Sequence, residues 1–140
     1  MIAALASAAM VQLSPAPVPP TGAPSAMLVP PPVTEWSTLP TYPLPRTASI
    51  ADGVGFVRDE VEAGRCHPQS PPPGDERLQL PVAILVGRAG QVRQIVPRAI
   101  GCPSVEQYVV GYLLSLTRTG TESSVSLPAG WYQLTAGYRW

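Results

Sequence analysis

Lysine and asparagine are absent from this 140-residue chain, histidine and phenylalanine occur once each, and cysteine occurs twice. Arginine supplies all of the positive charge, and its nine copies balance nine acidic residues, so the formal net charge is zero. A chain with no basic excess lacks the electrostatic signature of nucleic-acid-binding proteins and of polybasic membrane-surface proteins. We therefore expect no nucleic-acid partner.

Histidine and cysteine are too scarce to build the common metal and catalytic sites. One histidine and two cysteines cannot complete a zinc site without carboxylates. His67 follows Cys66 directly, and adjacent side chains of an extended segment point apart, which makes them a poor nucleophile pair. Asp59, Glu60 and Glu62 could be read as an acid–base set, but a solvated charged face explains them better. We predict no enzyme activity, no metal and no cofactor.

Proline is concentrated in the first third of the chain. Eleven of the nineteen prolines lie between Ser14 and Arg46. Proline fixes φ and has no N–H, so such a segment favours extended polyproline II structure over helices and sheets. We predict a disordered Pro-rich linker over residues 14–51 and one folded domain over residues 52–140.

Residues 1–13 are apolar and mostly small. They are too few to span the hydrocarbon core of a bilayer, but they fit the apolar region of a secretory signal or part of a membrane anchor. No arginine precedes them, so the usual positive start of a signal is missing. We expect export, with a cytoplasmic protein carrying a Pro-rich head as the alternative.

Cys66 and Cys102 form neither a CxxC motif nor part of a zinc quartet. In an exported chain a disulfide between them is the natural interpretation. Two buried free thiols are the alternative.

Residues 52–64 carry the marks of a short helix. Asp52 is expected as the N-cap and Gly64 as the residue that follows the helix, and three valines between them fall at helical spacing. Two glycines near the start weaken this pattern, so a strand over residues 55–61 is the alternative.

A β-hairpin is predicted next. Residues 80–86 are a short apolar run rich in β-branched side chains, residues 87–90 form a glycine-containing turn, and a second strand begins at Gln91. The first strand is apolar on both faces, which is typical of a central strand. Pro97 and several polar residues mark the second strand as an edge.

Residues 104–118 show the strongest helical pattern. Apolar side chains recur at i, i+3, i+4, i+7, i+8 and i+11 and form one stripe. These are Val105, Tyr108, Val109, Tyr112, Leu113 and Leu116. Ser104 and Gln107 predict a capping box at the helix start.

The chain closes with an alternating strand over residues 131–140. One face is apolar and is expected to pack on the helix stripe. The other face meets solvent or a partner and carries Trp131, Gln133, Thr135, Gly137 and Arg139. The predicted fold class is therefore α+β, with a small three-stranded antiparallel sheet (ββαβ) packed on one main helix. The expected strand order is second, first, last, which leaves the last strand at an edge.

These elements resemble the C-terminal domain of the TonB family. The hairpin Val82-Ala-Ile-Leu-Val86, Arg-Ala-Gly90, Gln-Val-Arg-Gln-Ile-Val96 is similar to the family's hairpin motif. Ser104-Val105-Glu106 stands where the family begins its helix with Leu-Asp, and a final strand ending in aromatic residues is also expected. The resemblance covers roughly residues 79–140, and the Pro-rich segment and apolar start match the family's overall plan.

The resemblance implies a periplasmic protein that binds an outer-membrane receptor or another envelope protein by strand addition. The last strand would be the docking edge, and energy would pass to receptor-dependent uptake. The family's Tyr-Pro motif, however, lies far upstream here as Tyr42-Pro43, and residues 1–13 contain no histidine to couple to a proton-driven motor. The alternative is a structural or interaction subunit of an envelope assembly that uses a TonB-like fold without energy transduction. An exposed aromatic edge would also permit a homodimer.

Overall fold

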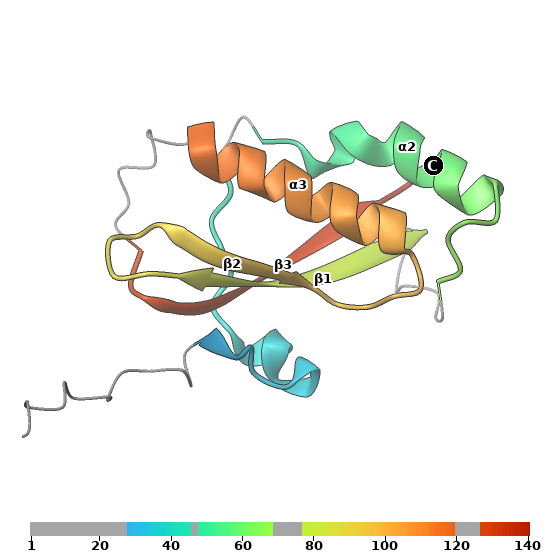
Figure 1. Ribbon diagram of the computed structural model, residues 1–140. Coiled ribbons are helices and arrows are strands. Elements are labelled where there is room, and N and C mark those ends of the chain that lie inside the picture. The colour runs from blue at the N-terminus through green and yellow to red at the C-terminus, as the bar shows by residue number, and fades with distance from the viewer. Residues whose placement is uncertain (1–27, 46–47, 69–76, 120–126) are drawn as a thin grey trace, which may run out of the picture.

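The structure is a computed structural model that describes residues 28–45, 48–68, 77–119 and 127–140. Its centre is a three-stranded antiparallel sheet of β1 (Leu78–Val86), β2 (Val92–Pro97) and β3 (Gly130–Tyr138), in the order β2-β1-β3. Helix α3 (Pro103–Thr119) and helix α2 (Val54–Glu62) lie on one face of this sheet (Figure 1). The predicted α+β class, the ββαβ order and the strand order are confirmed. Residues 1–27, which include the apolar start and the first part of the predicted linker, lie outside the described residues, as do residues 46–47 of that linker.

Strand β1 is the central strand of the sheet, and nearly all of its side chains are buried. Val82 to Val86 are each at most 4% exposed, so both faces of the strand are covered. Pro81 lies within β1, although proline cannot donate to a ladder. The β1–β2 ladder begins only at Val82, which pairs with Pro97. Pro81 lies one residue before that ladder, so its missing N–H breaks no hydrogen bond within it. A central strand therefore accommodates this proline.

Helix α3 packs its predicted stripe on the sheet. Val105, Val109 and Leu113 are at most 1% exposed, and burying a side chain of this size contributes about 1.5–3 kcal/mol. The predicted capping box is wrong, because the helix begins at Pro103 and Ser104 lies inside its first turn. The carboxylate of Glu106 instead accepts a hydrogen bond from the Cys102 N–H at 3.3 Å.

Helix α2 follows a 3-10 turn, η2 (Ile50–Gly53). Of the two alternatives for this region, the helix is the one observed. Asp52 is not its N-cap, because Asp52 lies in η2 and the cap residue is Gly53, with no side-chain bond. Gly64 has a φ of 71°, the left-handed conformation that favours glycine after a helix end.

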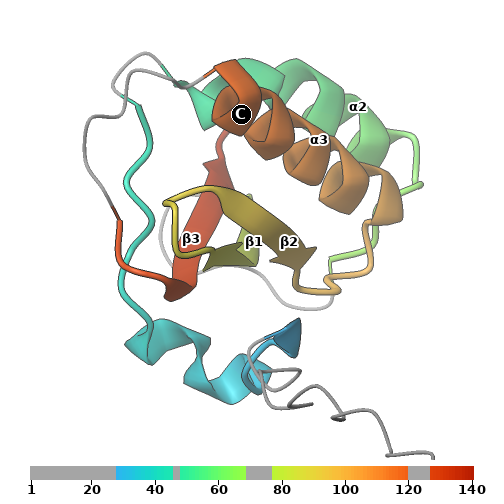
Figure 2. The ribbon, with the colours of Figure 1, turned by 60° about the vertical axis from the view of Figure 1, so that its left-hand side comes forward.

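The opposite face of the sheet is covered in part by another 3-10 helix, η1 (Val33–Thr38). Figure 2 shows η1 on the side of the sheet away from α2 and α3. Trp36 is its only buried residue, at 5% exposed, and its indole N–H donates to the Pro31 carbonyl at 2.9 Å. Part of the segment predicted as a linker is thus packed on the domain, and the folded unit extends upstream of residue 52.

Candidate functional site

The outer edge of β3 is partly covered by the chain itself. The Gln133 N–H donates to the Pro40 carbonyl at 2.9 Å, and the Gln133 carbonyl accepts from the Tyr42 N–H at 2.8 Å. These two bonds form a parallel bridge between Thr41 and Gln133. We call residues 40–42 the strap. The chain therefore already adds a short strand to the edge that the sequence predicts as a docking surface.

The strap is held by side chains as well as by backbone. Tyr42 packs edge-on against Tyr132, with ring centroids 6.2 Å apart, and burial raises the pKa of the Tyr42 hydroxyl. The Gln133 side-chain amide donates to the Thr41 hydroxyl at 3.3 Å. Sequence reasoning missed the strap because its flanking prolines favour a linker, and the only signal for it is the β-forming pair Thr41-Tyr42.

Beyond the strap, the outer edge of β3 has no further hydrogen-bonded strand from the described part of the chain. In an antiparallel strand, the N–H and C=O of one residue point to the same side, and successive residues alternate sides. The Gln133 backbone points outward, so the Thr135 and Gly137 backbones point outward too. Among the described residues, neither has a hydrogen-bond partner on that side. Strand pairing on this edge can therefore continue past the strap.

The five predicted edge residues have different surroundings. Thr135 and Arg139 are exposed, whereas Trp131, Gln133 and Gly137 are half-buried. Gln133 is bonded to the strap, and Arg139 follows the end of β3. The part of the predicted edge that is open for pairing is thus Thr135 and Gly137.

A groove of about 470 Å³ runs between η1 and the sheet and reaches this open edge. We call it the η1 groove. On the η1 side it is lined by Val33, Thr34, Trp36 and Ser37. On the sheet side it is lined by Pro81, Val82, Arg98, Gln133 and Thr135. Thr135 is therefore shared between the open backbone edge and the groove.

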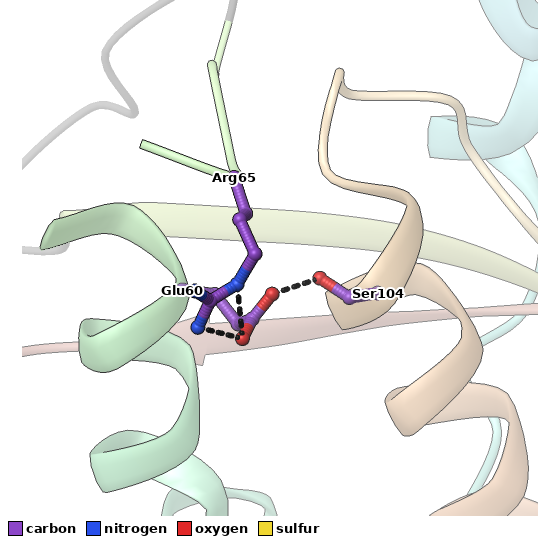
Figure 3. A network of polar contacts seen from close by, with 3 residues as sticks. All are labelled: Glu60, Arg65 and Ser104. Atoms are coloured by element: carbon purple, nitrogen blue, oxygen red, sulfur yellow. Dashed lines mark hydrogen bonds and ion pairs between the residues drawn. The ribbon is translucent and has the colours of Figure 1, made fainter. Parts of the chain in front are cut away.

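A buried polar cluster joins the two helices on the other side of the sheet. Glu60 is only 7% exposed, and Figure 3 shows its carboxylate between Arg65 and Ser104. The Arg65 guanidinium donates to Glu60 Oε1 at 2.7 and 3.0 Å, and the Ser104 hydroxyl donates to Glu60 Oε2. The hydrogen bonds from Arg65 and Ser104 lower the pKa of Glu60, and burial opposes them only in part.

The interpretation of Glu60 as part of a solvated charged face is therefore wrong. Its neighbours Asp59 and Glu62 fit that interpretation, with side chains 67% and 64% exposed. The Glu60 carboxylate is fully engaged in joining α2 to the first turn of α3, and this cluster is a structural link.

Cys66 and Cys102 are joined by a disulfide beside this cluster. The bond rules out the two free thiols and also any Cys66–His67 nucleophile pair, because a disulfide sulfur carries no thiolate. The His67 N–H donates to the Gly101 carbonyl at 3.0 Å, which ties the same two segments together.

Neither a metal cluster nor a membrane-spanning helix is found in the described part of the chain. No three His, Cys, Asp or Glu side chains gather there as metal ligands. No helix among those residues is long and apolar enough to cross a bilayer. Comparisons with protein-family models, with curated proteins and with solved structures find no significant match.

Proposed function

We propose that this is a periplasmic protein whose TonB-like domain binds an outer-membrane receptor or another envelope protein by strand addition. The observation that carries the proposal is the outer edge of β3. Thr135 and Gly137 direct their backbone N–H and C=O groups outward, and among the described residues they have no partner there. An added strand gains affinity from such groups and selectivity from its alternate side chains.

The strap supports the proposal from within the same molecule. Residues 40–42 pair with Gln133 in the parallel sense through two bonds of 2.8 and 2.9 Å. The edge thus accepts an extended segment without distortion of the β1–β3 ladder, which runs unbroken from Leu78 to Val86. A partner segment that continues this pairing needs only the geometry that the strap already has.

The disulfide supports the periplasmic part of the proposal. Structural disulfides persist in oxidising compartments and are rare in the cytosol. Energy transfer to a receptor and passive anchoring in an envelope assembly both use the same docking edge, so the proposal covers strand addition in either role.

A proline at Thr135 tests the proposal. The Thr135 N–H points away from β1, and its opposite residue is Pro81, so Thr135→Pro removes an outward donor while leaving the ladder bonds in place. We expect the full chain to capture an envelope protein from solubilised outer membranes, and we expect Thr135→Pro to abolish this capture. Thr135→Ala keeps the N–H and is the matched control that should retain it.

Folding of the proline variant is checked by its thermal transition and by its intact disulfide. Capture by a folded Thr135→Pro chain at the wild-type level would remove this edge from the interface and overturn the proposal.

A further inference from the structure

The η1 groove adds a chemical requirement to the strand-addition proposal, on which this inference rests. Arg98 is exposed and is the single charged residue among the described residues that line the groove. The three ion pairs within the described residues all involve α2 or Arg65. Arg98 therefore lines the groove, and it forms no ion pair with an acidic residue in the described part of the chain.

Arg98, Pro81 and Thr135 form one row across the sheet. Pro81 pairs with Thr135 in the β1–β3 ladder, and the Arg98 N–H donates to the Pro81 carbonyl at 2.9 Å. Residues opposite one another on neighbouring strands place their side chains on the same face. A residue of an added strand that pairs with Thr135 would extend this row and point its side chain into the η1 groove.

Charge and reach together define that side chain. Neighbouring strands are about 4.8 Å apart, so an added strand lies three spacings, about 14 Å, from the backbone of Arg98, with Pro81 and Thr135 between them. The guanidinium of Arg98, extended over Pro81, can meet a long acidic side chain that extends over Thr135. The two would form charge-assisted hydrogen bonds, which are shorter and stronger than neutral ones. Glutamate has a longer reach than aspartate.

We infer that the η1 groove binds an extended segment of a partner protein that carries a glutamate opposite Thr135. Backbone pairing with Thr135 and Gly137 supplies affinity, and the ion pair with Arg98 fixes the register and selects the partner. Trp36 and Val33, which line the η1 side of the groove, cover the aliphatic part of the same glutamate side chain.

A random peptide-display library tests the inference without a known partner. The full chain is immobilised as wild type, Arg98→Glu, Arg93→Glu and Thr135→Pro. Arg93 is an exposed arginine of β2 that does not line the groove, so Arg93→Glu controls for the change in net charge. We expect the wild type to enrich β-forming peptides that share one glutamate.

The affinity of the peptide that binds the wild type most tightly is then used to measure the contribution of the ion pair. We expect Arg98→Glu to lower the affinity for this peptide by about tenfold or more, because one charge-assisted contact is lost. Exchanging the shared glutamate for lysine should restore binding to Arg98→Glu, whereas Arg93→Glu should bind the original peptide as the wild type does.

Each other outcome overturns a different claim. Peptides that require Thr135 but show no acidic preference and no response to Arg98→Glu would overturn the glutamate inference and leave strand addition standing. If no peptide is enriched, or if every enriched peptide also binds Thr135→Pro, strand addition itself would be overturned. A dimer in sedimentation experiments that Thr135→Pro dissociates would identify a second copy of the chain as the occupant and overturn the inference.

Discussion

At the scale of single residues, the ionised carboxylate of Glu60 illustrates how position in the fold changes the role of a side chain. It is buried between α2 and α3, yet three hydrogen bonds from Arg65 and Ser104 stabilise its charged form. A buried carboxylate with such partners contributes to stability only while it is ionised.

Glu60 should therefore make stability depend on acidic pH. Its pKa lies below the ordinary value of 4.5, so its contribution is complete above about pH 4.5 and is lost as the pH falls through the lower folded-state pKa. We expect Glu60→Gln to lower the melting temperature at pH 7, and we expect this difference to shrink steadily below pH 4.5. The exposed neighbour, as Asp59→Asn, should change the melting temperature little. A difference between wild type and Glu60→Gln that stays constant down to pH 2 would contradict this role.

Tyr138 carries a buried hydroxyl that lacks a hydrogen-bond partner among the described residues. The side chain is 1% exposed, and burial, reinforced by Tyr108 and Tyr112, raises the pKa of Tyr138 to about 12. An unpartnered buried polar group costs about 1–3 kcal/mol. We expect Tyr138→Phe to raise the free energy of unfolding by about 1 kcal/mol in urea titrations.

Tyr132 provides the matched comparison for that measurement. Its hydroxyl donates to the Pro128 carbonyl at 2.8 Å, so Tyr132→Phe removes a satisfied bond and should lower the free energy of unfolding by about 1 kcal/mol. Equal losses in the two variants would show that the Tyr138 hydroxyl has a partner after all.

Which residues form the core could be predicted from the sequence, but the role of Glu60 could not. The stripe on α3 follows from spacing alone, because side chains three and four positions apart share a helix face. The Glu60 carboxylate accepts hydrogen bonds from Arg65, five positions away, and from Ser104, 44 positions away in sequence. A contact of that kind depends on how two helices meet, and no local pattern records it.

At the scale of elements, the C-terminal end of α2 is linked to the N-terminal end of α3. The Cys66–Cys102 disulfide, the Glu60–Ser104 bond and the His67–Gly101 bond all connect the segment that leaves α2 with the segment that enters α3. Helix α2 is short, and short helices depend on tertiary contacts for their stability. These links therefore hold α2 in place.

Reduction of the disulfide should weaken the whole domain. A bridge across 36 positions contributes about 3–4 kcal/mol, mainly by restricting the unfolded chain. We expect a reductant to shift the urea midpoint of the wild type downward by the corresponding amount. The Cys66→Ala/Cys102→Ala double variant should unfold near the reduced midpoint with or without reductant. An identical midpoint for oxidised and reduced wild type would show that this bond does not stabilise the fold.

The hairpin, the main helix and the last strand could be predicted because each has its own periodicity. Helix η1 and the strap could not, because proline-rich composition favours extended linkers. Tertiary contacts decide the structure of this segment. Trp36 is buried in the fold, and Thr41 forms a parallel bridge with Gln133. A strand edge presents unpaired N–H and C=O groups that can pair with a nearby extended segment.

At the scale of the whole molecule, the sheet lies between two unequal layers (Figures 1 and 2). Helices α2 and α3 cover one face, and η1 covers part of the other, so the opposite face keeps a groove beside the outer edge of β3. The position of β3 at an edge follows from the sequence, because a doubly buried β1 requires two neighbours. Only the structure shows that Thr135 and Gly137 are the β3 residues whose outward backbone groups have no hydrogen-bond partner among the described residues.

Amide hydrogen exchange along β3, measured by NMR on the full chain, tests the central claim most directly. The amides of Leu134 and Ala136 face β1 and that of Gln133 faces the strap, so all three should exchange slowly. The amides of Thr135 and Gly137 should exchange fast in the free chain and become protected when a selected strand-forming peptide is added. Protection of Thr135 and Gly137 in the free chain, or fast exchange at both with the peptide bound, would contradict a docking edge at this position.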